Sequence, residues 1–449
     1  MIQEDTICAL ATQAGGALSI VRVSGPTALQ AVSAISSVHC TQVSPNTIHY
    51  THITDDDGET IDEAMVTIYR APHSYTGEDS AEISCHGSRY IINKVLELLI
   101  GQGCRIAQPG EYTMRAYLNG KMDLCQAEAV ADLIASTNQA THHLAMSQLR
   151  GGITSELAQL RNQLLKLTSL LELELDFSDH EDLEFADRTE LLQLAETIKS
   201  HIIRLAHSFE TGQALKQGIP VVIVGKTNVG KSTLLNRLLN DERAIVSDIH
   251  GTTRDTIEDT IDIQGITFRF IDTAGIRQTT DKIEQIGINR TYTAIEKARI
   301  VLWLNDQEPT EAEQHEMLNR CKGKRLITVL NKCDKIADVS RCDSTYLSIS
   351  AKYGINIDCL QAAIYNAANI PSLKESDVII TNTRHYEALT KAQHDLTRVI
   401  DALRQQLSGD LVAEDLKLIL NGLAGVTGEG QITPNEVLSN IFQHFCIGK

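Results

Sequence analysis

The chain has 449 residues, and its 58 acidic and 40 basic side chains give a formal net charge of −18. Its length favours two or three domains over a single core, and the acidic balance disfavours a protein that binds nucleic acid unaided, because cations must displace phosphate counterions. The ten cysteines form no C-x-x-C pair and no histidine cluster has metal spacing, so neither a disulfide framework nor a zinc site is predicted.

The first 119 residues predict an α+β domain. Strand-like runs at 17–23 and 64–69 are mixed with a helix-like segment at 91–100, a combination typical of that class. The N-terminus carries Glu4 and Asp5 where a secretory signal carries bases, and no apolar run approaches the ~18 residues that span a bilayer. We therefore expect a soluble cytoplasmic protein that does not enter a membrane.

Residues 120–218 predict the first part of a helical domain. Apolar residues recur at near-helical spacing from 157 to 171 and from 191 to 209, which indicates two antiparallel helices. The acidic stretch at 171–190 lies between the two patterns. Its most economical interpretation is a solvated helix face and turn, although a basic partner docking there is an alternative.

Residues 219–374 predict a nucleotide-binding domain. The strand-like run at 219–224 leads into GKTNVGKS (225–232), which fits the pattern G-x-x-x-x-G-K-[ST], and a helical segment follows. In this pattern loop amides and a helix N-terminus hold nucleotide phosphates, the lysine bridges the outer phosphates and the serine hydroxyl binds magnesium. The placement between strand and helix disfavours a chance match.

Later motifs select the base. NKCD (331–334) follows a strand-like run, and Asp334 can accept from guanine N1–H and N2–H, which adenine lacks in that arrangement. DTAG (272–275) precedes this motif and SAK (350–352) follows it. Together with GTTRD (251–255), which alone would be a polar turn, the ordered series resembles the Ras-like GTPases.

That resemblance assigns roles to the later motifs. It implies that Asp272 holds magnesium through water, that the Gly275 amide senses the γ-phosphate, and that Thr253 completes the magnesium shell with Ser232. The same resemblance places residues 350–352 behind the guanine.

One position lacks the usual catalyst. Ile276 stands where Ras-type enzymes carry a water-orienting glutamine, so hydrolysis needs another source of charge, a role in which an arginine finger is worth ~10³ to 10⁵ in rate. Asn228 can help bind a monovalent cation beside the phosphates. Glu284 can orient the attacking water through a bridging water, with an exposed helical carboxylate as the alternative.

Residues 375–449 predict the second part of the helical domain. Helical patterns return near 384–406, 411–423 and 434–445. The simplest arrangement is one discontinuous helical domain, 120–218 with 375–449, into which a Ras-like domain at 219–374 is inserted. The predicted fold class is thus α/β plus all-α plus α+β multidomain.

The segments outside the nucleotide domain resemble the MnmE (TrmE) family of tRNA-modification GTPases over essentially the whole length. Four stretches carry the resemblance: TGED (76–79) with HG (86–87), PGEYTMRAYLNGK (109–121), DLCQAEAV (123–130) and FCIGK (445–449). The family resemblance implies an N-terminal domain like folate-dependent aminomethyltransferases, which binds a tetrahydrofolate and mediates dimerisation. The folate-contact positions that it implies are Arg22, Glu82, Lys121 and Lys449.

The resemblance also completes the GTPase site. It implies a potassium-dependent hydrolysis with magnesium, in which G domains dimerise, Glu284 is the catalytic glutamate, and potassium is bound at Asn228, Ser247, Ile249 and Thr252. The residues expected to contact GTP are Asn228, Val229, Gly230, Lys231, Ser232, Thr233, Ser247, Asp248, Ile249, His250, Gly251, Thr252, Thr253, Asp272, Thr273, Ala274, Gly275, Asn331, Lys332, Asp334, Ser350, Ala351 and Lys352.

The implied reaction needs a second protein. The family acts with a flavoprotein partner, MnmG, which carries FAD, to add an aminomethyl or carboxymethylaminomethyl group to C5 of the wobble uridine of certain tRNAs. The one-carbon unit comes from 5,10-methylene-tetrahydrofolate, for which 5-formyl-tetrahydrofolate is an analogue. The resemblance implies a homodimer that joins MnmG in a heterotetramer or larger assembly, and the acidic balance predicts that tRNA binds mainly through the partner.

Two departures and two alternatives accompany the resemblance. Thr227 stands where the family's phosphate loop usually has proline, which removes a φ restraint, and Ser88 stands where glycine commonly follows His86-Gly87.

A potassium-dependent GTPase acting on rRNA shares the central motifs, although it usually adds a basic module that is not visible here. A folate-dependent one-carbon transferase with a regulatory GTPase, active without RNA, is the other alternative.

Overall fold

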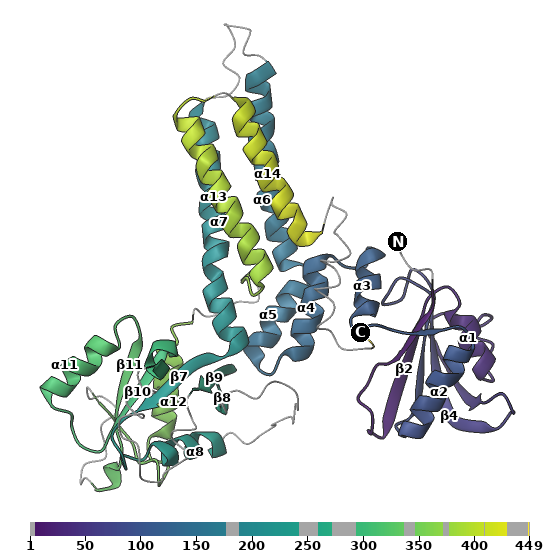
Figure 1. Cartoon of the computed structure of the whole chain (residues 1–449), viewed down its shortest axis with the longest axis horizontal. Helices are drawn as coiled ribbons and strands as arrows, with labels where there is room; N and C mark the ends of the chain where they lie inside the picture. Colours follow the sequence, from purple (N-terminus) through teal and green to yellow (C-terminus); the bar gives the residue numbers. More distant parts are fainter. Residues whose placement is uncertain are drawn as a thin grey trace. The chain divides into compact units, whose positions relative to one another are not determined.

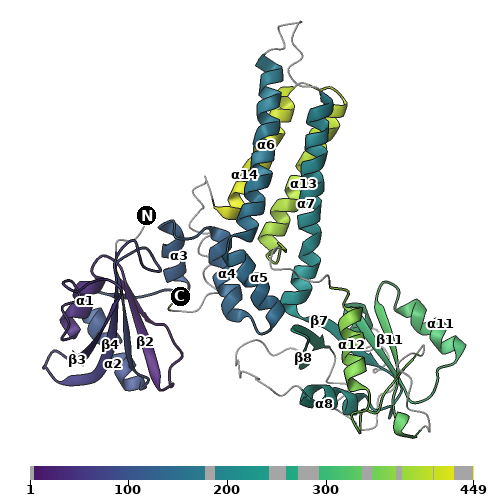
Figure 2. The ribbon, with the colours of Figure 1, turned by 180° about the vertical axis from the view of Figure 1, so that it is seen from behind.

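A computed structural model of the chain describes residues 5–176, 188–241, 259–271, 293–335, 346–370, 377–407, 409–428 and 448 (Figures 1 and 2). The chain forms two compact units. One contains residues 1–135, 148–201 and 388–449, and the other contains 136–147 and 202–387. The finer division into four segments made from the sequence stays a prediction.

The first unit contains a mixed sheet of six strands in the order β3-β4-β5-β2-β1-β6. The strands are β1 (Ile7–Leu10), β2 (Leu18–Ser24), β3 (Thr47–Thr54), β4 (Thr60–Tyr69), β5 (Ser80–His86) and β6 (Arg105–Ile106). Helices α1 (Ala28–Ile35) and α2 (Arg89–Gly101) cover one face, where every second side chain of the central strands is buried. This alternation follows from the two-residue period of a strand, and the strands and helix expected in this region are confirmed.

The opposite face of this sheet is only partly covered. Helix α3 (Glu111–Leu118) places Tyr112 against Ile7 and Ala9 of β1. Farther along the same face, Tyr50 pairs with Met65 across β3 and β4, and the two side chains are 59% and 41% exposed. The sheet therefore has one fully packed face and one face with exposed apolar side chains.

Long helices form the rest of the first unit and continue into the second. They are α4 (Leu124–Ala135), α5 (Gln139–Leu149), α6 (Gly152–Asp176), α7 (Arg188–Gln217), α13 (Thr383–Arg404) and α14 (Gly409–Thr427). Helices α6 and α14 pack side by side, as Figure 1 shows. None of the described helices is long and apolar enough to cross a membrane.

The helices expected around 157–171, 191–209, 384–406 and 411–423 are confirmed as α6, α7, α13 and α14. The structure extends α7 to Gln217, where Gly218 with φ of +81° ends it in the left-handed conformation that a residue with a Cβ avoids. The helix expected at 434–445 and most of the acidic stretch lie outside the described residues.

The second unit contains a second six-stranded sheet, in the order β12-β11-β10-β7-β9-β8, in which only β8 runs antiparallel to its neighbour. Its strands are β7 (Ile219–Val224), β8 (Asp259–Ile263), β9 (Ile266–Phe270), β10 (Ile300–Asn305), β11 (Arg325–Leu330) and β12 (Leu347–Ser348). Its helices are α8 (Lys231–Asp241), α11 (Glu311–Arg320) and α12 (Ile357–Ala367). The strand-like run at 219–224 and the one that precedes NKCD (331–334) are confirmed as β7 and β11.

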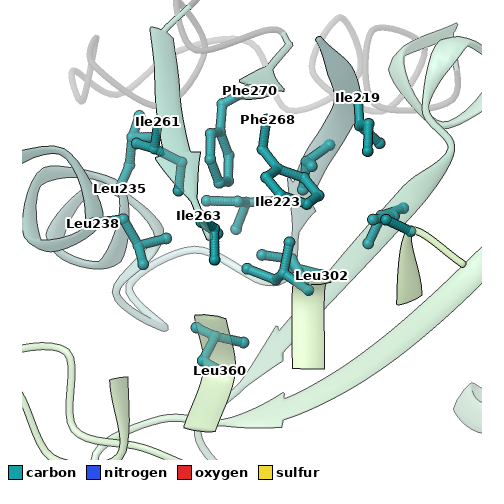
Figure 3. Close-up of a cluster of buried hydrophobic side chains, with 14 of the residues drawn as sticks. Ile219, Ile223, Leu235, Leu238, Ile261, Ile263, Phe268, Phe270, Leu302 and Leu360 are labelled. Atoms are coloured by element: carbon teal, nitrogen blue, oxygen red, sulfur yellow. The ribbon is translucent and has the colours of Figure 1, made fainter. Parts of the chain in front are cut away.

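The central strands β7 and β10 are buried on both faces, which explains why they read as continuous apolar runs. Alternate side chains of β7 and β10, including Ile223 and Leu302, pack with α8 and α12 in the cluster of Figure 3. The intervening side chains, including Val222 and Val301, pack on the other face with residues around α11. The carboxyl ends of β7, β10 and β11 meet at one edge because these strands are parallel, and the phosphate loop and the NKCD motif follow β7 and β11 there.

Candidate nucleotide-binding site

The phosphate loop connects β7 to α8 and is held close to its neighbours. Gly225 has φ of +156°, and a Cβ there would lie 2.2 Å from the carbonyl oxygen of Leu304. Gly230 has φ of +100°, and its Cβ would lie 2.4 Å from Nδ2 of Asn331. Asn228 also has a positive φ, +62°, which asparagine tolerates better than most side chains. The glycines therefore permit both the curvature of the loop and its close packing.

Lys231 is folded back over this loop. Its ammonium Nζ donates to the carbonyl oxygens of Gly225 at 2.5 Å and Lys226 at 2.9 Å. Burial lowers the pKa of Lys231, because the charged form loses hydration. Ser232 and Thr233 follow in the first turn of α8, where backbone N–H groups without helical partners point outward and favour anions.

Asn331 joins the phosphate loop to the turn predicted behind guanine. Its side chain is buried, and its Nδ2 donates to the carbonyl oxygen of Val229 at 2.8 Å. Its Oδ1 accepts from the backbone N–H of Ala351 at 3.0 Å. Three segments that are distant in sequence are thus fixed to one another by a single carboxamide.

Lys332 makes a second connection on the same side of the loop. With φ of +67°, it places Nζ 2.8 Å from the carbonyl oxygen of Asn228 and 2.9 Å from Oδ2 of Asp306. The hydrogen bond from Lys332 lowers the pKa of Asp306. Asp306 directly follows β10, so this ion pair links the ends of two neighbouring strands.

Asp334 faces the 350–355 turn. Its Oδ1 accepts from the Ser350 hydroxyl at 2.6 Å, and the backbones of Ser350 and Ile355 exchange two hydrogen bonds of 3.1 Å. The structure thus brings the predicted NKCD and SAK motifs together with the phosphate loop. All three lie at the carboxyl edge of the sheet, where open α/β sheets bind ligands.

A polar cluster on the first unit's sheet contains two predicted folate contacts. Arg22 of β2 and Glu82 of β5 are direct cross-strand partners, and Nη2 of Arg22 lies 2.7 Å from Oε1 of Glu82. The guanidinium carbon lies 5.5 Å from the ring centre of Tyr75 and 5.6 Å from that of Tyr112. Burial raises the pKa of both tyrosines, so both rings stay neutral next to the cation.

The other two predicted folate positions border the same cluster. Lys121 donates from Nζ to the carbonyl oxygen of Pro72 at 2.8 Å, on the loop that also carries Tyr75. Nη1 of Arg22 donates to the carbonyl oxygen of Gly448 at 3.2 Å, the residue before Lys449. The structure brings Arg22, Glu82 and the backbone next to Lys449 together, and it places Lys121 against the shared loop.

Several predicted residues fall outside the described residues. These are Ser247, Asp248, Ile249, His250, Gly251, Thr252, Thr253, Asp272, Thr273, Ala274, Gly275, Glu284 and Lys449. Within the ranges that the structure describes, no three His, Cys, Asp or Glu side chains are grouped so as to hold a metal ion. The expected magnesium and potassium ligands are mainly hydroxyl, amide and carbonyl oxygens.

Sequence reasoning did not identify four residues of these sites. Asp306 and Arg237 contact predicted motifs, and Tyr75 and Tyr112 enclose Arg22. Tyr112 lies in the 109–121 stretch that carried the family resemblance, so a signal existed for it. Asp306 and Arg237 make their contacts with residues far apart in the sequence, and no local sequence pattern indicates these contacts.

Comparisons with known proteins cover the whole chain. Residues 6–121 match the family described as GTP-binding protein TrmE N-terminus, and residues 124–446 match the MnmE helical domain. The tRNA modification GTPase MnmE of Phocaeicola vulgatus is 52% identical over 498 residues, covering 100% of both chains. That of Flavobacterium johnsoniae is 47% identical over 470 residues, again covering 100% of both. Among solved structures, the G domain of the T. maritima FeoB iron transporter matches at 22% identity with a TM-score of 0.24, covering 33% of this chain and 98% of that chain.

The fold and the arrangement of its motifs define a multidomain P-loop GTP-binding protein of the Ras-like class. The two family matches and the identity over the full length then place it more narrowly. The chain belongs to the MnmE (TrmE) family of tRNA modification GTPases. The fold class and the family resemblance predicted from the sequence are confirmed.

Proposed function

We propose that this GTPase hydrolyses GTP with potassium stimulation and, with the flavoprotein MnmG, modifies C5 of the wobble uridine, position 34, of certain tRNAs. The added group is aminomethyl or carboxymethylaminomethyl, its one-carbon unit comes from 5,10-methylene-tetrahydrofolate, and FAD is bound by the partner. The protein acts in the cytoplasm. The observation that carries the proposal is the Arg22–Glu82 pair between two tyrosine rings, on a chain that also carries a guanine-nucleotide site.

The described residues fit a guanine nucleotide. Lys231 exchanges its two loop carbonyl partners for the outer phosphates, and the first amides of α8 bind phosphate oxygens. Asp334 accepts from the guanine N1–H and N2–H groups, with Ser350 orienting the carboxylate through its 2.6 Å hydrogen bond. Magnesium, which neutralises charge on the β and γ oxygens, is held by Ser232 with Thr253.

Potassium replaces the missing arginine finger. Asn228 lies in the phosphate loop and shares the cation with Ser247, Ile249 and Thr252, while Glu284 orients the attacking water. This assignment is supported by Ile276 at the position of the usual glutamine and by the left-handed backbone of Asn228. Magnesium-loaded protein should hydrolyse GTP much faster in potassium than in sodium, and Glu284→Ala should abolish hydrolysis while GTP binding persists. Equal rates in both salts would reject the potassium role.

The sheet cluster fits a reduced folate. Glu82 offers carboxylate oxygens to the donors of a pterin ring, and the side chains of Arg22, Lys121 and Lys449 offer cations to the carbonyl and carboxylate groups of its tail. The side chains of Arg22 and Glu82 are only 20% and 22% exposed, so their charges interact in partly desolvated surroundings. When bound, the folate supplies the one-carbon unit, and these residues bind and orient it.

The exposed face of the same sheet supports the proposal of a homodimer. On this face Ile48 is 61% exposed, Tyr50 59%, Met65 41% and Leu18 66%. The row containing Tyr50 and Met65 lies next to the row that contains Glu82 and Arg22. A second copy of the chain would cover this apolar surface, which is consistent with a dimeric family member.

Sedimentation can test the dimer. Tyr50→Asp should shift the full-length protein toward the monomer, because it introduces a charge into the apolar contact. Tyr90→Asp is a matched control, since Tyr90 is 67% exposed and lies on α2, the helix that covers the opposite face of the sheet. A Tyr50→Asp protein with an unchanged sedimentation coefficient would contradict this interface.

Mass analysis of tRNA tests the function as a whole. Cells that lack this protein should lose the C5 substituent of the wobble uridine, and the wild-type gene should restore it. Arg22→Ala should fail to restore the modification, whereas Arg89→Ala, an exposed arginine at the start of α2, should succeed. Persistence of the substituent without the protein would reject the proposal and favour a role on rRNA or in one-carbon transfer without RNA.

A further inference from the structure

Arg237 connects the helix that starts at the phosphate loop to the turn at 350–355. It lies six residues after Lys231 on α8, whose Leu234, Leu235 and Leu238 are buried against the sheet. Nη2 of Arg237 donates to the carbonyl oxygen of Lys352 at 2.8 Å, and Nε donates to that of Ala351 at 3.3 Å. The guanidinium thus binds two consecutive carbonyl groups from one side.

The opposite side of the turn is bound by Asn331. The Ala351 amide group donates to Oδ1 of Asn331 while the Ala351 carbonyl accepts from Arg237. The guanidinium carbon also lies 3.8 Å from the position of a Cβ on Gly354, so it packs closely against the end of the turn. The turn is therefore fixed between two side chains, one from α8 and one from the end of β11.

We propose that Arg237 is a positioning residue for guanine recognition. It acts through the 350–352 turn and has no contact with the nucleotide of its own. The planar guanidinium of Arg237 keeps the turn in the conformation that the guanine base requires, so nucleotide binding does not have to order the turn. The inference rests on the proposed role of residues 350–352 behind guanine, and it adds a residue that no phosphate-loop or base motif contains.

The chemistry of arginine suits this role better than that of lysine. A planar guanidinium presents parallel donors to two carbonyl oxygens at once, whereas an ammonium is a single point donor. Because both hydrogen bonds are charge-assisted, losing the two together should change the nucleotide equilibrium constant by about tenfold. The loss should weaken binding of the guanine base and leave binding of the phosphates largely unchanged.

The test measures nucleotide affinity of the full-length chain with fluorescent GDP, and with ADP as a competitor. Arg237→Ala should weaken GDP binding about tenfold, leave ADP binding unchanged and leave kcat at saturating GTP unchanged. Arg237→Lys should give an intermediate GDP affinity, because one donor remains. Arg325→Ala is the matched control, since Arg325 is exposed at the opposite end of β11, and it should bind GDP as the wild type does.

The outcomes separate the two hypotheses. A wild-type protein that binds GDP no better than ADP would overturn the proposed guanine site itself. A wild type that prefers GDP, together with an Arg237→Ala variant of unchanged GDP affinity, would overturn only the role of Arg237. Equal losses for GDP and ADP would do the same, because they indicate general damage. If Arg237→Ala does not fold, the intermediate affinity and unshifted ADP affinity of Arg237→Lys decide the question.

Discussion

The side chain of Asn331 donates to the backbone carbonyl of Val229 across 2.8 Å, and this hydrogen bond is buried. Gly230 lies next to Val229, and its missing Cβ is what allows the Asn331 amide to approach. The phosphate loop and the base-recognition motif are therefore packed directly against each other. A change at Asn331 should affect both halves of the site.

Asn331→Ala should lower the thermal midpoint of the nucleotide domain and weaken GDP binding. The substitution leaves the Val229 carbonyl and the Ala351 amide without their partner, and an unsatisfied buried group costs about 1–3 kcal/mol. Differential scanning fluorimetry with and without GDP measures both effects. Asn319→Ala is a control, because Asn319 bonds only to His315 on the exposed surface of α11. A variant as stable as the control would contradict the assignment.

Deprotonation of Lys231 should make GDP affinity depend on pH in the alkaline range. Burial lowers its pKa from the ordinary value of 10.5, so the side chain loses its proton at a lower pH than a solvated lysine. Deprotonation removes the charge that attracts phosphate. GDP affinity should therefore decrease as the pH rises toward 10.5, with proton uptake on binding in that window.

The lowered pKa of Lys231 also makes the stability of the folded protein depend on pH. Because its folded pKa lies below the unfolded value of 10.5, the buried charge opposes folding at neutral pH, and this penalty is lost as the pH rises from the folded pKa to the unfolded value. Lys231→Arg stays protonated throughout, so its weaker GDP affinity should decline less than that of the wild type across the same window. Calorimetry in buffers of different ionisation enthalpy counts the protons. An equal alkaline decline in both proteins would exclude Lys231 as its origin.

Some strands of each sheet and the long helices were predicted because their patterns are local. The run at 219–224 is apolar at every position because both faces of its sheet are covered, and α6 carries leucines at helical spacing. Gly218 marks the end of α7 by its backbone conformation. Motif order similarly predicted that Lys231, Asn331 and Ser350 would share a site.

The remaining contacts of the site depend on tertiary structure. Asp306 meets Lys332 because β10 and β11 are parallel neighbours with ends in register. Arg237 meets Lys352 because α8 and the 350–355 turn lie at one edge of the same sheet. The two residues of each pair are far apart in the chain, and no hydrophobic period or motif relates them. A single sequence therefore gives no basis for inferring the contact.

A buried ionic network ties the 109–121 stretch to the first sheet and makes this domain sensitive to acid. Arg115 is 4% exposed and contacts Asp5 at 2.7 Å, Glu78 at 3.2 Å and Glu111 at 3.0 Å. Burial raises the pKa of Glu111, but hydrogen bonds from Arg105 and Arg115 outweigh it and lower the pKa overall. The pKa of Asp5 is lowered in the same way.

The lowered carboxyl pKa values determine the direction of the pH effect. Stabilisation by Asp5 and Glu111 is complete above their unfolded pKa values, 3.8 and 4.5, and is lost as the pH falls through the lowered folded values. Arg115→Met should destabilise the domain by about 3–5 kcal/mol at pH 7, because it removes the buried cation that Asp5, Glu78 and Glu111 share. The gap to the wild type should narrow as the pH falls toward 4, where the carboxylates of the variant take up protons more readily than those of the wild type. Thermal melts at both pH values, with Arg89→Ala as the control, would contradict this if the gap stayed constant.

Two helical glycines should respond to alanine in opposite directions. Gly212 lies in α7, and a Cβ there would be 2.2 Å from the backbone carbonyl oxygen of Ile380. The neighbouring backbone would have to move, which typically costs about 1–3 kcal/mol for an overpacked site. Gly422 lies in α14, and within the described part of the chain no atom beyond its own helix backbone and chain neighbours lies within 4 Å of its Cβ position. Alanine there should stabilise the helix by about 0.5–1 kcal/mol through the lower backbone entropy of the unfolded chain. Thermal unfolding of Gly212→Ala and Gly422→Ala measures both signs, and a stabilised Gly212→Ala protein would show that α7 and the Ile380 segment are not in close contact.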